Sequence, residues 1–415
     1  MTEQEMTLEI ARRVKAAGGR VLLVGGNVRD RLMGVASKDM DIEVYGVTPA
    51  ALRGILSTLG EPYDKGASFC VLGLRHYDLD IAMPRRESRT GLKHTDFDVS
   101  VDPFLSYEEA SRRRDFTINA MMYDPLTGEV IDCWGGREDL ARRVIRHVSG
   151  ETFGDDPLRV FRAAQFAARL RADIAPETVA ISRGLDVTHL SHERVWEEFS
   201  KALLKADAPS VFFRALREMG QLSPFFPEID ALPEDAYETA LRRVDTAAGL
   251  RGEAREDLHF MLALLLSPFP DVWNDGEARA LSQVKRLTTA VRAQRYVQNA
   301  LALRDEPLRL FRTQAAPLDT RLMFDRSLCP RDLALTGVAL AGARERDAAR
   351  AYLTERVADY EQRAAQPMLT GRDLMAAGYP AGARMKEQLA YARRLHFGDA
   401  TPQDALEAVK ARYPL

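Results

Sequence analysis

The sequence is poor in cysteine and has no long apolar run, and both absences limit what the chain can be. It has three cysteines in 415 residues, and their wide spacing fits neither a zinc motif nor a disulfide framework. We therefore expect Cys70, Cys133 and Cys329 to be reduced and buried. No apolar stretch approaches the roughly 20 residues that cross a bilayer. The first residues lack the apolar region of a signal peptide. We therefore expect a cytoplasmic location and no membrane partner.

An excess of positive charge is also missing, since the formal net charge is −3 at pH 7. This does not exclude a nucleic-acid partner, because a local cluster of arginines is enough to hold phosphates. Such clusters occur at residues 112–114 and 137–146. The apolar content of 46% allows sizeable cores, and a chain of this length is enough for about two to four compact units.

The most informative stretch is residues 21–45, VLLVGGNVRDRLMGVASKDMDIEVY. Its apolar start predicts a buried strand, and Gly25 and Gly26 predict a turn into a short helix. Asp39 and Asp41 alternate on a second strand, so they point the same way, roughly 6–7 Å apart. Two carboxylates that face a glycine turn suit Mg²⁺ and a triphosphate, because backbone N–H groups can approach phosphates there. A surface turn beside a salt-bridged edge strand is the competing interpretation.

Two acids of a later predicted strand, residues 77–83, also share one face. Metal-dependent nucleotidyl transfer often uses a third carboxylate, as a metal ligand or as a base. The strand pattern offers both Asp78 and Asp80; an exposed strand acid without a catalytic role is an equally good interpretation of either.

The string RRDFTINA places three polar groups among buried positions. Arg114 can contact phosphate or ribose through its planar guanidinium, and Asn119 can bond to sugar hydroxyls. Asp115 can hold the Arg114 guanidinium in place. A buried Arg–Asp pair with a purely structural role is the alternative.

The segment GDDPLRVFRAAQFAARL predicts a helix over residues 157–170, capped by Gly154 and Asp155. Asp156, Arg159 and Arg162 recur every three residues and therefore share a face. An Asp that accepts from an exocyclic amine and an Arg that donates to a ring nitrogen favour cytosine and adenine over uracil and guanine. A donor buried against a donor costs about 1–3 kcal/mol, whereas an ordinary surface ion pair contributes only a few tenths of a kcal/mol.

These motifs resemble those of the class II tRNA nucleotidyltransferases and bacterial poly(A) polymerases, within the DNA polymerase beta superfamily of nucleotidyltransferases. The resemblance rests on GGNVRDRLMG…KDMDIEVYG, RRDFTINA, GDDPLRVFR and ERVWEEFSKALL, and it covers about residues 15–232 strongly and 366–410 moderately. It implies that Arg29 joins the two glycines at the phosphates, and it favours Asp80 as the third carboxylate. It also implies that the residues of the GDDPLRVFR segment select the base, and that Arg194 pairs with an acid of that site. Asp155 replaces a more common Glu, and Gln165 replaces a more common Arg.

The resemblance implies an α+β head with a mixed sheet and helices, followed by an all-α neck, body and tail. We predict the head over residues 1–140, the neck with the base-selecting helix over 141–205, the body over 206–340 and the tail over 341–415. The body has no adjacent His–Asp pair, so we expect no HD phosphohydrolase activity, and we expect His259 to be structural. The polar segment 85–102 predicts a mobile loop.

The predicted function is Mg²⁺-dependent, template-independent addition of CMP and AMP to the 3′ end of tRNA, with CTP and ATP as substrates and pyrophosphate as the product. In this prediction Asp39 and Asp41 hold the metal. A poly(A) polymerase, or an enzyme that adds only CC or only A, would keep the same motifs. A non-catalytic RNA-binding protein is the alternative from another class.

Overall fold

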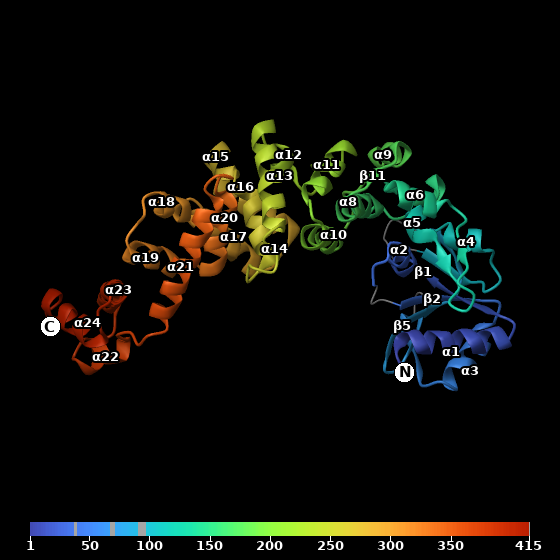
Figure 1. Cartoon of the computed structure of the whole chain (residues 1–415), viewed down its shortest axis with the longest axis horizontal. Helices are drawn as coiled ribbons and strands as arrows, with labels where there is room; N and C mark the ends of the chain where they lie inside the picture. The colour runs from blue at the N-terminus through green and yellow to red at the C-terminus, as the bar shows by residue number, and fades with distance from the viewer. Residues whose placement is uncertain (37–39, 67–70, 90–96, 415) are drawn as a thin grey trace. The chain divides into compact units, whose positions relative to one another are not determined.

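A computed structural model of the chain describes residues 1–36, 40–66, 71–89 and 97–414. The chain divides into two compact units. The first comprises residues 1–202 and 211–224, and the second comprises residues 203–210 and 225–415. The first unit is a mixed sheet with helices and the second is helical, which confirms the predicted fold class (Figure 1). The finer division into neck, body and tail stays a prediction.

A seven-stranded sheet forms the centre of the first unit, with the order β3-β4-β5-β2-β1-β8-β9. Its strands β2 and β5 are parallel, and the other neighbouring pairs are antiparallel. The strands are β1 (Arg20–Val24), β2 (Met40–Tyr45), β3 (Pro62–Gly66), β4 (Val71–Leu74), β5 (Tyr77–Ala82), β8 (Met122–Tyr123) and β9 (Val130–Ile131). The predicted strands at residues 21–24 and 77–83 are thereby confirmed.

The two faces of the sheet have different partners. Alternate residues of the central strands, such as Leu23 and Ile42, pack in one core with helix α1 (Glu3–Ala16) and helix α3 (Pro49–Ser57). The opposite face carries Leu22, Val24 and Tyr45 in a smaller cluster. Because side chains alternate along a strand, Asp41 and Glu43 of β2 belong to this second face.

Helix α1 shows why a short stretch at the start of the chain is ordered. Thr2 and Glu5 form a capping box, in which each side chain accepts a hydrogen bond from the other residue's backbone N–H. Acids lie in the first turn and bases in the last, which is the favourable order for the helix dipole. The apolar side of the helix then buries Met6, Ile10 and Val14 against the sheet.

Smaller elements complete the first unit. The helices are α2 (Gly26–Leu32), α4 (Tyr107–Ser111), α5 (Thr117–Ala120), α6 (Gly136–Arg142), α7 (Gly150–Phe153), α8 (Arg159–Leu170), α9 (Pro176–Arg183), α10 (His192–Lys205), whose last residues fall in the second unit, and α11 (Ser210–Glu218). Two further strand pairs are β6 (Arg85–Arg89) with β7 (Phe97–Val101), and β10 (Val144–Ile145) with β11 (Asp173–Ile174). The prediction of a loop over residues 85–102 is therefore wrong for the β6–β7 pair. Its ladder is made by backbone groups, which need no apolar side chains.

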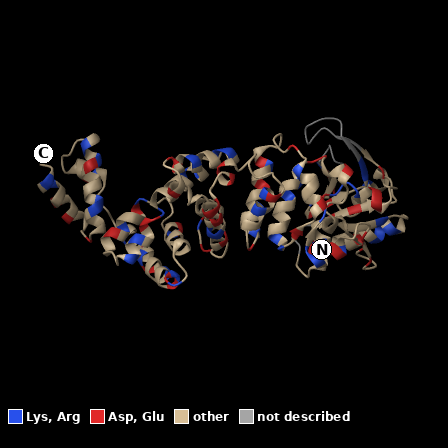
Figure 2. Ribbon diagram, turned by 90° about the horizontal axis from the view of Figure 1, so that it is seen from above, with Lys and Arg blue, Asp and Glu red and all other residues tan. Residues whose placement is uncertain are grey.

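The second unit is built from helices that pack in separate apolar clusters. One cluster contains Phe324 and Leu353, and another contains Leu374 and Val409. In Figure 2, basic and acidic residues are interspersed along these helices. The helices are α12 (Pro227–Asp230), α13 (Glu234–Ala248), α14 (Asp257–Leu266), α15 (Phe269–Val272), α16 (Gly276–Leu287), α17 (Val291–Leu303), α18 (Glu306–Arg312), α19 (Pro317–Asp325), α20 (Pro330–Leu340), α21 (Arg346–Ala364), α22 (Gly371–Ala376), α23 (Ala383–Phe397) and α24 (Pro402–Arg412).

The structure shows the surroundings of His259 and the exposure of two cysteines. His259 Nδ1 contacts Glu256, and its ring centroid lies 5.5 Å from that of Tyr296. Cys329 is buried, but Cys133 is exposed, so the prediction of a buried thiol is wrong for Cys133; Cys70 lies outside the described residues. Among the residues that the structure describes, no helix combines the length and the apolar character needed to cross a membrane.

Candidate active site

The turn after β1 brings a glycine next to two charged side chains. Gly25 has a φ of +71°, a backbone conformation that favours glycine. A Cβ at this position would lie 3.5 Å from Arg114 Nη1 and 3.7 Å from Asp41 Oδ2. Residues predicted from two separate motifs, residues 21–45 and RRDFTINA, therefore meet at one point of the sheet. Gly26 follows as the first residue of α2.

The predicted carboxylates of β2 and β5 lie on neighbouring strands. Asp41 is half-buried and is the register partner of Asp80 in the parallel pair. Lys65 Nζ donates to Asp80 Oδ1 at 2.6 Å and to Asp78 Oδ1 at 3.3 Å. Burial opposes the charge on Lys65, but the hydrogen bond and charge of Asp80 outweigh it and raise the pKa of Lys65. Asp39 lies outside the described residues.

Sequence reasoning missed Glu43, a buried acid on the same face of β2 as Asp41. Arg113 Nη2 donates to Glu43 Oε1 at 3.0 Å, and the Tyr45 hydroxyl donates to Oε2 at 2.7 Å. Arg114 Nη2 lies 3.9 Å from Oε2. Burial and the Glu43 charge raise the pKa of Tyr45, so its hydroxyl stays a donor. The alternation in DMDIE was the available signal, because it puts a third acid on the face of the other two.

Asn119 links Arg29 to Asp115. Arg29 Nη1 donates to Asn119 Oδ1 at 2.7 Å, and Asn119 Nδ2 donates to Asp115 Oδ1 at 3.1 Å. Arg29 also donates from Nε and Nη2 to Asp30 Oδ1, and it is only 3% exposed. Burial lowers the pKa of Arg29 despite the neighbouring Asp30. In this conformation both predicted ligand-binding groups, Arg29 and Asn119, are bound to protein atoms.

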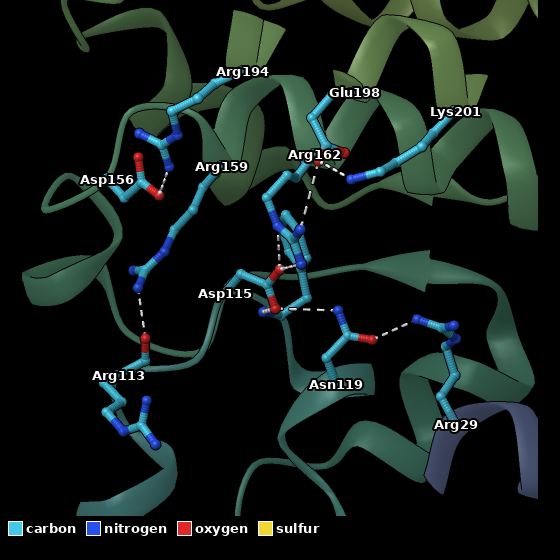
Figure 3. A network of polar contacts seen from close by, with 11 residues as sticks. Arg29, Arg113, Asp115, Asn119, Asp156, Arg159, Arg162, Arg194, Glu198 and Lys201 are labelled. Atoms are coloured by element: carbon cyan, nitrogen blue, oxygen red, sulfur yellow. Dashed lines mark hydrogen bonds and ion pairs between the residues drawn. The ribbon is translucent and has the colours of Figure 1, made fainter. Parts of the chain in front are cut away.

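Asp115 holds a different arginine from the one predicted. Arg162 donates from Nε and Nη2 to Asp115 Oδ2, at 2.8 and 2.6 Å (Figure 3). The expectation that Asp115 fixes Arg114 is therefore wrong, because Arg114 lies beside Glu43 and Asp41. Burial disfavours the Asp115 carboxylate, but the charge and hydrogen bonds of Arg162 and the amide of Asn119 outweigh it, and the pKa of Asp115 is lowered.

The predicted base-selecting residues lie together but do not share a helix face. Helix α8 begins at Arg159, and Asp156 belongs to the preceding turn, where its Oδ1 accepts from Leu158 N at 3.2 Å. The predicted caps Gly154 and Asp155 therefore do not cap α8. Pro157 also precedes the helix.

The side chains of this segment have defined partners. Arg194 Nη2 donates to Asp156 Oδ2 at 2.7 Å, which confirms the predicted contact between Arg194 and an acid of this segment. Arg159 donates to the backbone carbonyls of Thr152 and Arg113, at 2.6 and 2.5 Å. Figure 3 shows Arg159 extending from α8 to the Arg113 backbone. The residues 113–119 thus connect the sheet, through Glu43, to α8, through Arg159 and Arg162.

Helix α10 contributes a buried acid, Glu198, that lies near Arg162 of α8. Glu198 is buried, its Oε1 accepts from Lys201 Nζ at 2.8 Å, and Arg162 Nη1 lies 3.8 Å from the same oxygen. Its Oε2 has no hydrogen-bond partner among the described residues. Gln165, which replaces the more common Arg, is buried on α8. It therefore cannot reach solvent-exposed phosphate in this conformation.

The oxygen ligands present suit a hard divalent cation. Mg²⁺ is commonly held by one or two carboxylates together with substrate phosphates, and Asp41 offers such a carboxylate next to the Gly25 turn. Within the described ranges, no three His, Cys, Asp or Glu residues gather as a metal cluster. Of the described residues, Asp41 is the carboxylate that could hold a metal at this point, together with the phosphates of the nucleotide itself.

Comparisons with known proteins match the same parts of the chain. Residues 21–146 match a family described as the poly A polymerase head domain, and residues 174–232 match one described as a probable RNA and SrmB-binding site of polymerase A. The Multifunctional CCA protein of Aromatoleum aromaticum is 42% identical over 220 residues, which are 51% of this chain and 52% of that protein. This chain thus spans about half the length of the curated relatives it matches.

Solved structures share the fold along nearly the whole chain. The Bacillus stearothermophilus CCA-adding enzyme in complex with CTP matches with a TM-score of 0.71 and 24% identity, over 99% of both chains. The Thermotoga maritima CCA-adding enzyme complexed with tRNA matches with a TM-score of 0.69 and 18% identity, over 98% of this chain and 95% of that one. The two matched segments contain motifs described above, and over them this chain resembles the class II tRNA nucleotidyltransferase and bacterial poly(A) polymerase family.

Proposed function

We propose that this chain adds CMP and AMP to the 3′ end of tRNA, using CTP and ATP and releasing pyrophosphate. The observation that carries the proposal is the meeting of Gly25, Asp41 and Arg114 at the end of β1, with α8 linked to the same segment. The names of the matched relatives, Multifunctional CCA protein and CCA-adding enzyme, support the choice of tRNA, CTP and ATP.

In this proposal the sheet binds the reacting end of the nucleotide. Asp41 and Asp39 hold Mg²⁺, which when bound would neutralise phosphate charge and lower the pKa of the attacking 3′-hydroxyl. Gly25 and Gly26 leave space for phosphate oxygens next to the backbone, and Arg114 contacts the triphosphate or the ribose. Arg29 and Asn119 act indirectly, by holding neighbouring residues in place, since they bond to each other and to neighbouring acids. Asp80 is the candidate third carboxylate.

The base is selected by Asp156 and Arg159. Asp156 is only half-buried and keeps lone pairs beyond those used by Arg194 and Leu158, so it can accept from the amine of cytosine or adenine. Arg159 donates to two neutral backbone carbonyls, and a ring nitrogen of the base can replace one of them. Arg162 contributes by holding Asp115 rather than by direct contact.

The experiment is an incorporation assay with purified full-length protein and Mg²⁺. The tRNA transcripts end before each of the three nucleotides of the CCA end, and each is given CTP, ATP, both, UTP or GTP. We expect CMP at the first two positions and AMP at the third, with no further extension. Long adenylate tails would indicate a poly(A) polymerase, and addition confined to C or to A would indicate a partial enzyme. Absence of incorporation with every nucleotide would overturn the proposal in favour of an RNA-binding protein.

The Asp156→Asn variant tests base selection. The amide can present N–H groups where the carboxylate only accepts, so discrimination against UTP and GTP should fall by about 10- to 100-fold, the equivalent of about 1–3 kcal/mol. The measurement is the ratio of kcat/KM for CTP and UTP, and for ATP and GTP. The control is Asp173→Asn, the same change at an exposed acid of β11, which should leave both ratios unchanged. Unchanged ratios in Asp156→Asn would remove Asp156 from base selection.

A further inference from the structure

Glu43 is an almost fully buried acid whose surroundings are unusual. Its side chain is 1% exposed, and two arginines and one tyrosine hydroxyl face its two oxygens. A buried carboxylate is costly unless it is paired and hydrogen-bonded, and here the pairing comes from Arg113 at 3.0 Å and Tyr45 at 2.7 Å. A structural role alone would be met by these two partners.

The third partner points toward the candidate active site. Arg114 Nη2 lies 3.9 Å from Glu43 Oε2, while Nη1 of the same guanidinium lies 3.5 Å from the position of a Cβ on Gly25. Asp41 Oδ2 lies 3.7 Å from that same position. One end of the Arg114 guanidinium therefore lies near Glu43, and the other lies near the Gly25 turn, where Asp41 also lies.

This geometry makes the charge on Glu43 decisive for where Arg114 rests. With the Glu43 carboxylate in place, the buried end of the guanidinium has an acidic partner, and its other end lies at the turn. Without that charge, Asp41 becomes the nearest acid of the strand, and opposite charges a few ångströms apart attract by several kcal/mol at the effective dielectric of a protein surface. Arg114 would then neutralise the carboxylate that is meant to hold the metal.

Building on the proposed function, we propose that Glu43 is a positioning residue that holds Arg114 beside Gly25, where the guanidinium meets the incoming nucleotide and stays off Asp41. Glu43 itself touches neither nucleotide nor metal. The role differs from a packing role because it acts through one other residue, and it therefore predicts that the effects of changing Glu43 and Arg114 are not independent.

A double-mutant cycle measures that dependence. CTP binding to the full chain is measured by calorimetry with Mg²⁺ and without tRNA, so that no chemistry occurs. We expect Glu43→Gln and Arg114→Gln each to weaken CTP binding by about tenfold, and the double variant to be no weaker than Arg114→Gln alone, because residues in contact are coupled. A double variant weaker by the product of the two single effects would overturn the proposal, as would wild-type affinity in Glu43→Gln.

Two control variants separate this role from general damage. Glu61→Gln removes an ion-paired but exposed acid of the same unit, 66% exposed beside Arg75, and it should bind CTP like the wild type. Arg113→Gln leaves the Glu43 side chain unchanged and keeps the backbone carbonyl of residue 113, which accepts from Arg159. It should change CTP affinity by less than about twofold if Arg114 is the relevant partner of Glu43. A tenfold loss in Arg113→Gln would overturn the assignment to Arg114.

If Glu43→Gln does not fold, Glu43→Asp tests the same point, because it keeps the charge but withdraws it by one methylene group. We then expect weaker CTP binding with an unchanged circular dichroism spectrum, and unchanged affinity would contradict the proposal. The two proposals fail differently. A wild-type chain that neither binds CTP nor incorporates it overturns both, whereas a wild-type chain that does so and matches its Glu43 variants overturns only the role of Glu43.

Discussion

Replacing Asp41 by asparagine is expected to lower nucleotide incorporation by at least about 1,000-fold while leaving tRNA affinity nearly unchanged. The substitution keeps the size of the side chain but removes the charge that faces the Gly25 turn. Metal-assisted stabilisation of transition-state charge is worth several kcal/mol, and about 4 kcal/mol corresponds to about 1,000-fold in rate. The measurement is single-turnover incorporation of CMP into a tRNA transcript, together with tRNA binding by filter retention.

The neighbouring strand offers a matched control. Asp78 lies on β5, its side chain is 87% exposed, and its contact with Lys65 is the longer of the two at 3.3 Å. Asp78→Asn makes the same chemical change in the same sheet, and it should alter the incorporation rate by less than about twofold, as expected for an exposed ion pair. If Asp41→Asn and Asp78→Asn behave alike, Asp41 does not hold the metal.

Asp80→Asn, measured in the same series, decides whether Asp80 takes part in the reaction. Asp80 is the register partner of Asp41 and pairs with Lys65. A loss of about 100-fold or more would make it a third carboxylate of the reaction. A loss below about tenfold would leave it as the partner of Lys65 in the sheet.

The sequence predicted the elements of the head better than it predicted the partners of the side chains. The apolar run at residues 21–24 and the alternation around Asp41 fix a strand and its faces, because burial of one face sets the register of a strand. Both strands are observed, and they place Gly25 next to Asp41. Helical spacing equally located α8, which begins two residues later than predicted and ends at the predicted residue.

The partners could not be read from the sequence because several arginines compete for each acid. Asp115 follows Arg114 directly in the chain, yet it accepts from Arg162, which lies 47 residues away. The choice depends on how α8 packs on the segment 113–119, and spacing along the chain carries no information on that packing. For the same reason the three-residue spacing of Asp156, Arg159 and Arg162 suggested one helix face, although Asp156 precedes the helix.

Breaking the Asp115–Arg162 pair is expected to give the largest loss of stability among the variants considered. Asp115→Asn keeps the Oδ1 acceptor for Phe116 N and Asn119 but removes the charge that accepts two bonds from Arg162. Removing one partner of a buried pair leaves an uncompensated charge. Because the Arg162 side chain is 33% exposed, we expect about 3 kcal/mol, at the lower end of the range for buried pairs. Calorimetry of the full chain should show the transition of the first unit about 6–12 °C lower.

The pH dependence of this difference identifies its source. The pKa of Asp115 is lowered in the folded protein, so its contribution to the free energy of unfolding is fully present above the unfolded value of about 3.9. The contribution is lost as the pH falls further, through the folded value. The difference in free energy of unfolding between the wild type and Asp115→Asn should therefore be constant near neutral pH. It should shrink and disappear as the pH falls below about 4. A difference that persists unchanged at lower pH would point to packing rather than charge.

The double variant Asp115→Asn/Arg162→Met separates the pair from its two members. Arg162→Met retains much of the aliphatic stem, removes the guanidinium that lies over the Phe166 ring, and leaves Asp115 charged without its main partner. Because the double variant contains neither charge, it should be more stable than the sum of the two single losses predicts, by at least about 1 kcal/mol. Asp173→Asn, a change at an exposed acid of the same unit, should alter the free energy of unfolding by less than about 0.5 kcal/mol. Strict additivity would mean that Asp115 and Arg162 stabilise the unit through separate contacts, and α8 would then be held to the segment 113–119 mainly by Arg159 and the apolar core.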